Sequence, residues 1–395
     1  MFQRYATLIC GLFLVFSCSD DAPPAAAERT GPPAATAAEL PGRWPAERAR
    51  AYVADRPLPL GANYNPRSAI NQLEMWQAAT FDPAQIDEEL GWAAAQGMNS
   101  MRVYLHNLIW EADSTAYAAR IDRYLDIADR HGISTTFVLF DAVWDPESAL
   151  GPQPAPRPRL HNSGWVQSPT GAQLLSGADY YPAAKRFVQG VLRRFADDPR
   201  VYMWDLYNEP DNHNFGKFPD ESKEKADYVF PLLARTFGWA RAVNPSQPLT
   251  AGVWYGDLFN RTEEDLPLNR FNAFQLNNSD VISYHHYRDT AHHRLILEKL
   301  SAYGRPLVCT EYIARTHGST FATTLPLLDE YGVGAYNWGL VAGKTNTIYP
   351  WASWDSTFTA EPHLWHHDVF RPDGSLYQQA EGELLRASGA RRAKK

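Results

Sequence analysis

The chain has 395 residues, which is enough for one large domain or two ordinary ones. Hydrophobic residues make up 45% of it and charged residues 21%, a composition that excludes wholesale disorder and a protein with many membrane spans. The formal net charge of -8 argues against a nucleic-acid partner, because phosphate binding needs clustered lysine and arginine side chains. A neutral ligand remains compatible with this charge.

The N-terminus predicts an export signal. Arg4 supplies a positive charge, and the apolar run 8–16 is too short to span a bilayer as a mature helix. Residues 15–18, Val-Phe-Ser-Cys, resemble a bacterial lipobox, and the Ser-Asp-Asp that follows resembles the surface-export signal of Bacteroidetes lipoproteins. We therefore expect a signal peptide over 1–17, a lipid anchor on Cys18 as the only membrane attachment, and a position at the bacterial outer membrane or cell surface. Cleavage by an ordinary signal peptidase, giving a periplasmic or secreted protein, is the alternative.

Residues 18–50 predict a disordered tether, because their Ala- and Pro-rich runs contain almost no large apolar side chain. The rest of the chain, 51–390, is expected to form one folded domain. Cys309 is the cysteine left for this domain, so no intrachain disulfide is expected. It lies in an apolar run, and we interpret it as a buried small hydrophobe rather than a nucleophile.

From residue 58 onward, short apolar runs alternate with amphipathic stretches, which is typical of a parallel sheet with crossover helices. The predicted strands are 58–64, 100–105, 133–140, 201–207, 248–254, 281–285, 307–312 and 333–338. Strands and helices that alternate in this way and close on themselves predict a single (β/α)8 TIM barrel. A doubly wound open sheet is the alternative, but no Gly-rich phosphate fingerprint follows the first strand.

Two of the predicted helices carry clear signals. The first has Asp82 as N-cap, Pro83 in the first helical position, Gln85 reaching back, and Gly97 as terminator. The second runs over about 178–196. Its apolar face consists of Phe187, Val188, Val191, Leu192 and Phe195.

Two glutamates stand at the ends of predicted strands. Glu209 follows the fourth strand, in Asn208-Glu209-Pro210, and Glu311 ends the seventh, in Thr310-Glu311-Tyr312. In a barrel both carboxylates face the end of the barrel at which the strands terminate, from opposite sides. Such a pair is what glycoside hydrolysis requires, because one group protonates the leaving oxygen and the other attacks the anomeric carbon. The alternative is that both are ordinary glutamates at strand ends.

With these motifs, residues 58–385 resemble the retaining glycoside hydrolases of clan A, and most nearly family 5. The resemblance implies that Glu209 is the acid/base, Glu311 the nucleophile, and Asn208 a contact to the substrate's 2-hydroxyl. It also implies that Arg102, on the second strand, keeps the nucleophile ionised, and we group Arg102 with the substrate-binding residues. A structural ion pair at the other end of the barrel is the alternative for this arginine.

The resemblance extends to two further strand ends. His285 and Tyr287, after the sixth strand, match the family's His-x-Tyr, which implies that the tyrosine bonds to the nucleophile. Trp338, on the eighth strand, matches the tryptophan that forms the floor under the cleaved sugar, with a core position as the alternative. A metal site is not expected, because none of the adjacent histidine pairs, at 285–286, 292–293 and 366–367, has the spacing of catalytic zinc ligands.

The third predicted strand departs from the family, because it ends at Asp141 where a histidine is usual. We expect His106, just after the second strand, to fill that space as a polar contact to the sugar. The aromatic residues in loops (Trp351 or Trp354 first, then Trp144, Trp165 and Trp254) are candidate sugar platforms or plain loop packing.

The sequence thus predicts a monomeric retaining β-glycoside hydrolase that uses no cofactor. Its substrate would be a β-linked polysaccharide or oligosaccharide of the mannan, glucan or xylan type, cleaved by double displacement. A non-catalytic glycan-binding lipoprotein on the same barrel is the first alternative. A metal-dependent barrel hydrolase that uses the histidines is the second.

Overall fold

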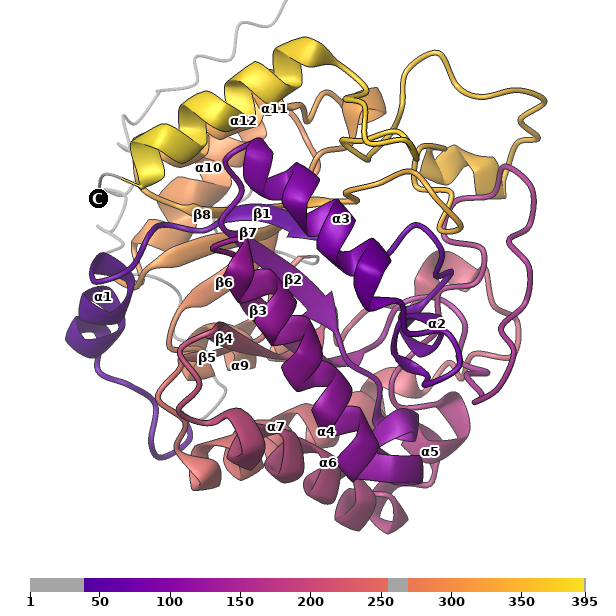
Figure 1. Cartoon of the computed structure of the whole chain (residues 1–395). Helices are drawn as coiled ribbons and strands as arrows, with labels where there is room; N and C mark the ends of the chain where they lie inside the picture. Colours follow the sequence, from indigo (N-terminus) through magenta and orange to yellow (C-terminus); the bar gives the residue numbers. More distant parts are fainter. Residues whose placement is uncertain (1–38, 255–268, 394–395) are drawn as a thin grey trace, which may run out of the picture. The chain divides into compact units, whose positions relative to one another are not determined.

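A computed structural model describes residues 39–254 and 269–393. It contains a parallel barrel with helices on its outside (Figure 1). The strands are β1 (Leu60–Asn63), β2 (Ser100–Tyr104), β3 (Ser134–Asp141), β4 (Val201–Asn208), β5 (Leu249–Thr250), β6 (Ile282–His285), β7 (Leu307–Tyr312) and β8 (Gly334–Trp338). Every predicted strand is present.

The sheet follows the order β5-β4-β3-β2-β1-β8-β7-β6, so β1 pairs with β8. The remaining seam, between β5 and β6, is closed by a parallel bridge from Val253 to Tyr284. In this bridge the Val253 amide donates to the Ser283 carbonyl at 3.0 Å, and the His285 amide donates to the Val253 carbonyl at 3.0 Å. The predicted (β/α)8 barrel is therefore confirmed, and the open doubly wound sheet is excluded.

The described helices are α1 (Ala46–Ala54), α2 (Gln72–Trp76), α3 (Pro83–Ala95), α4 (Asn107–Arg130), α5 (Gly171–Leu175), α6 (Tyr181–Phe195), α7 (Lys225–Val243), α9 (Arg270–Asn278), α10 (Thr290–Ser301), α11 (Phe321–Tyr331) and α12 (Gln379–Arg392). Their apolar faces pack on the barrel, as the five predicted core residues of α6 illustrate, since all of them are buried. No described helix has the length and apolar character needed to cross a bilayer.

The start of α3 matches its predicted signals in all but one respect. The Asp82 side chain accepts hydrogen bonds from the amides of Ala84 and Gln85, and Gly97 has a φ of +81° beyond the C-terminal end. The sequence predicts that the Gln85 side chain reaches back to the cap, and the structure shows that it does not. It donates instead to the fully buried carboxylate of Glu89, at 2.7 Å, because a buried carboxylate needs donors.

The folded part begins earlier than the predicted tether allows. The Leu40 amide donates to Asn278 at 2.7 Å, the Arg43 guanidinium donates to the Leu276 carbonyl at 2.6 Å, and the Trp44 amide donates to Asp280 at 2.8 Å. The tether predicted for 18–50 is therefore wrong over its last part, 39–50. Its remainder, the predicted signal peptide and Cys18 lie outside the described residues.

The core of the fold is apolar. It includes Cys309, which is fully buried and has a free thiol, as predicted. Burial raises the pKa of this thiol well above its usual range, so it has no thiolate character.

Candidate active site

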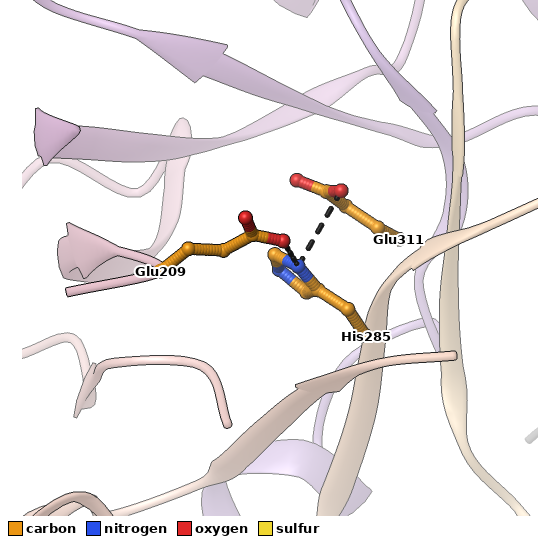
Figure 2. A group of neighbouring side chains, drawn as sticks. All are labelled: Glu209, His285 and Glu311. Atoms are coloured by element: carbon orange, nitrogen blue, oxygen red, sulfur yellow. Dashed lines mark hydrogen bonds and ion pairs between the residues drawn. The ribbon is translucent and has the colours of Figure 1, made fainter. Parts of the chain in front are cut away.

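Glu209 and Glu311 lie close together at the C-terminal end of the barrel, here called the barrel mouth. Glu209 directly follows β4, and Glu311 lies within β7. Figure 2 shows both carboxyl groups directed toward the ring of His285, from the end of β6. One oxygen of each carboxyl group and a ring nitrogen of the histidine all lie within 4.8 Å of one another. Parallel strands that end at one rim bring together residues that are far apart in the sequence.

The Glu311 carboxylate is held by three donors. Oε1 accepts from Arg102 Nη1 at 2.9 Å and from the Tyr104 hydroxyl at 3.0 Å, and Oε2 accepts from the Tyr287 hydroxyl at 2.6 Å. Burial raises the pKa of Glu311, and the Arg102 charge and the Tyr287 hydrogen bond oppose that rise. These contacts fix the carboxylate and favour its charged form.

Arg102 is fully buried beneath the two glutamates. Its guanidinium forms an ion pair with Asp205 at 2.7 Å and also donates to Asn63 and Asn208, each at 2.7 Å. Arg102 does not line the cavity above the two glutamates, so its predicted place among the substrate-binding residues is wrong. It is a positioning residue for Glu311 and Asn208.

Glu209 has a different environment. Its Oε2 accepts from Asn212 Nδ2 at 2.6 Å, and its Oε1 lies 2.7 Å from Nδ1 of His285. Burial raises the pKa of Glu209 to about 7 and lowers that of His285 to about 4. The histidine is therefore neutral near pH 7, and an added proton binds Glu209 rather than the ring. Glu209 also has a φ of +44°, a left-handed conformation that is unusual for a residue with a side chain.

Asn208 is oriented by an arginine and an aspartate. Its side-chain oxygen accepts from Arg102, and its Nδ2 donates to Asp141 at 2.9 Å. Asp141 also accepts from the Trp165 indole at 2.8 Å, and burial raises its pKa to about 7. The aspartate at the end of β3 thus holds an amide that lines the cavity.

His106 does not take the place predicted for it. Its Nδ1 accepts from the Leu108 amide as the N-cap of α4, and its Nε2 lies 3.0 Å from the Gln167 carbonyl. The side chain is fully buried, and burial lowers its pKa to about 3. The predicted sugar contact is therefore wrong, because both ring nitrogens are engaged away from the cavity.

A cavity of about 480 Å³ opens above the two glutamates. Among its lining residues are both glutamates, Asn208, Tyr287, Trp144, Trp254, Trp338, Trp351 and Trp354. Trp165 does not line this cavity; it packs edge-on behind Trp338, with ring centroids 5.6 Å apart. Aromatic faces with a few convergent polar groups suit a neutral ligand rich in hydroxyl groups.

Four residues of the site were not identified from the sequence. Asn63 and Tyr104, at the ends of β1 and β2, contact the Arg102 guanidinium, and Asp205 neutralises it from within β4. Asn212 donates to Glu209 from the loop after β4. A polar residue in an otherwise apolar strand is the signal that points to Asn63 and Asp205.

Glu209, His285 and Glu311 could together offer three ligand atoms to a cation. Both Glu311 oxygens already accept hydrogen bonds, and the Arg102 charge lies beside them, which disfavours a second positive charge. Within 39–254 and 269–393, the remaining histidines form no comparable group of three metal-binding side chains.

No protein-family model and no curated protein matches the sequence. Solved structures do match. An exo-β-1,4-mannosidase from Opitutaceae bacterium strain TAV5 aligns with a TM-score of 0.55 and 19% identity over 85% of this chain and 60% of its own, so the chain spans less than two thirds of that enzyme. An endo-β-1,4-mannanase from Thermotoga petrophila aligns with a TM-score of 0.52 and 12% identity over 86% of this chain and 77% of its own. The β-glucosidase 1317 aligns with a TM-score of 0.54 and 12% identity over 84% of this chain and 98% of its own. The described part of the chain thus has the (β/α)8 barrel fold of these glycoside hydrolases.

Proposed function

We propose that the protein is a retaining β-glycoside hydrolase of the family 5 type, with Glu209 as acid/base and Glu311 as nucleophile. The observation that carries this proposal is the close approach of the two carboxyl groups, each in a different environment, at the base of an aromatic cavity. Retaining enzymes hold their carboxyl groups about 5–5.5 Å apart, whereas inverting enzymes separate them by about 6.5–9.5 Å to admit a water. A separation of oxygen atoms within 4.8 Å favours the retaining arrangement.

In the first step, a Glu311 oxygen attacks the anomeric carbon while the glycosidic bond breaks. Glu209 gives its proton to the departing oxygen, so the leaving group departs as a neutral alcohol. Tyr287 and Arg102 keep the attacking carboxylate charged and oriented. Burial keeps Glu209 protonated up to about pH 7, as a general acid requires.

In the second step, Glu209, now a carboxylate, takes a proton from a water molecule. The water oxygen attacks the anomeric carbon, and the bond to Glu311 breaks, which regenerates both side chains. The neutral ring of His285 stays 2.7 Å from Glu209 Oε1 and supports either protonation state, since Nδ1 can donate or accept.

The substrate class that we propose is a β-linked polysaccharide or oligosaccharide of mannan, glucan or xylan type. Several tryptophans at the cavity support this class because they offer flat faces to sugar rings. The mannosidase, mannanase and glucosidase with the same fold act, by their names, on such sugars. We propose that the protein acts as a monomer.

The proposal is tested by incubating purified protein with aryl β-glycosides and with mannan, glucan and xylan. Wild type should release sugar from one of them, Glu311→Ala should not, and Glu330→Ala, at an exposed ion pair on α11, should behave as wild type. Activity that persists in Glu311→Ala would refute the assignment. Activity lost on adding a chelator would favour a metal-dependent hydrolase instead.

We also propose that the protein is exported and carries its lipid on Cys18, at the outer membrane or cell surface. The apolar run 8–16 and the lipobox-like residues 15–18 support this proposal. Mass spectrometry of the N-terminal peptide from the native host would test it, because a lipidated Cys18 should be the first residue.

A further inference from the structure

Two long loops meet above the barrel mouth. The Asn162 amide, in the loop after β3, donates to the Thr345 carbonyl, in the loop after β8, at 2.8 Å. The Trp354 indole donates to the His161 carbonyl at 2.9 Å. Since β2 and β1 lie between β3 and β8 in the sheet, these contacts close the mouth over β1 and β2. Figure 1 shows the two loops side by side, one magenta and one orange to yellow.

The loop after β4 joins them. Lys217 forms an ion pair with Asp355, and Phe218 packs edge-on against Trp354 with ring centroids 5.6 Å apart. Trp144, in the loop after β3, stacks on the same Trp354 ring at 5.2 Å and 11°. We call these five residues the wall. Four of them, all except Phe218, line the cavity.

The contacts between the loops after β3 and β8 lie over β1 and β2, across the barrel from β5 and β6, and the loop after β4 reaches them only with Lys217 and Phe218, beyond Glu209. Glu209 after β4 and Trp254 after β5 lie on the side that receives the leaving group, because Glu209 must reach the departing oxygen. The sugar attacked by Glu311 therefore has its far end against the wall. A polymer can be cut internally only if its chain can extend out of the cavity on both sides of the cleaved bond.

From this arrangement we infer that the enzyme acts on chain ends and removes a mono- or disaccharide of one fixed length from the non-reducing end of a β-linked chain. This inference rests on the proposed function. A cavity of about 480 Å³ lies within the roughly 300–1,000 Å³ that is typical of pockets for small ligands, which suits a mono- or disaccharide.

The test uses borohydride-reduced β-1,4-linked oligosaccharides of mannose, glucose or xylose of increasing length, with products followed by mass spectrometry. Reduction marks the reducing end. We expect one product of constant length from the unmarked end and a marked fragment that shortens stepwise. A mixture of internal fragments, or a rapid fall in polymer viscosity, would overturn the inference and leave the proposed function intact. Failure to hydrolyse any substrate would instead count against the proposed function.

A variant that opens the wall tests its role directly. Lys217→Ala with Trp354→Ala should raise the ratio of internal to terminal cleavage several-fold on a polymer. The control is Arg294→Ala with Glu330→Ala, which removes an exposed ion pair on α10 and α11 and should leave the ratio unchanged. An unchanged ratio in the wall variant, with normal thermal unfolding, would contradict the assignment of the limit to this wall.

Discussion

Nδ1 of His285 lies 2.7 Å from Oε1 of Glu209 and 3.4 Å from Oε2 of Glu311. One neutral ring thus lies close to both carboxyl groups of the proposed catalytic pair. Because its own pKa is lowered to about 4, the ring does not take the proton that Glu209 needs.

The product of the first turnover should keep the configuration of the substrate. Two displacements at the anomeric carbon restore the starting β-configuration. Proton NMR during hydrolysis of a β-linked substrate should therefore show the β-anomer before mutarotation. If the α-anomer appeared first, the nucleophile role of Glu311 would have to be abandoned.

Chemical rescue with azide should distinguish the proposed role of Glu311 from that of Glu209. Glu311→Ala should lower turnover by on the order of 10⁴-fold or more, because no second carboxylate can attack the anomeric carbon. Added azide should restore turnover and give an α-glycosyl azide in Glu311→Ala, but a β-glycosyl azide in Glu209→Ala. The same azide anomer from both variants would show that one role is misassigned.

Activity should fall as pH rises through about 7. The pKa of Glu209 is raised to about 7 by burial, so its acid form is lost above that value. We expect kcat/KM for an alkyl β-glycoside to decline on the basic side of this pKa. With a dinitrophenyl leaving group, which needs no proton, the decline should flatten. An equally steep decline with both substrates would assign the titration to another group.

Arg102 should affect activity and stability in separable ways. Arg102→Met leaves the buried Asp205 carboxylate without its partner and should lower the free energy of unfolding by about 3–5 kcal/mol. Adding Asp205→Asn should recover part of that stability, measured by chemical denaturation. Turnover should not recover, because Glu311 still lacks its guanidinium donor. Recovery of both together would mean that Arg102 has only a structural role.

Cys18→Ser should release the protein from membranes of the native host, because we propose that a lipid on this residue anchors it there. Fractionation followed by immunoblotting would measure this. Unchanged membrane association would point to retention of the apolar run 8–16 instead.

The barrel was predictable because its strands are short apolar runs with regular spacing, and because strand ends in a barrel share one rim. This placed Glu209 and Glu311 together without knowledge of any contact, whereas the place of Tyr287 beside Glu311 came from the family resemblance. β5 is shorter than predicted, because only Leu249 and Thr250 pair along β4 and the rest of 248–254 is tied to β6 by a single bridge.

Contacts between distant loops were not predictable. His106 follows β2, as the sequence predicts. The contacts of its ring with the Gln167 carbonyl and with the start of α4, which the sequence does not reveal, determine where the ring points. The composition of 39–50 likewise does not predict that this segment is part of the fold. Hydrogen bonds from its backbone and from Arg43 hold it in place, and no run of apolar side chains marks it in the sequence. The wall also arises from three loops whose meeting no local pattern reveals.

The left-handed backbone of Glu209, with a φ of +44°, places the proposed acid/base where glycine or asparagine would fit better. Such a conformation costs on the order of 1–3 kcal/mol, which the surrounding fold must absorb. Selection for thermal stability alone would therefore favour replacing the side chain to which we assign proton donation. Directed evolution toward higher thermal stability would need an activity screen at every round to retain this glutamate.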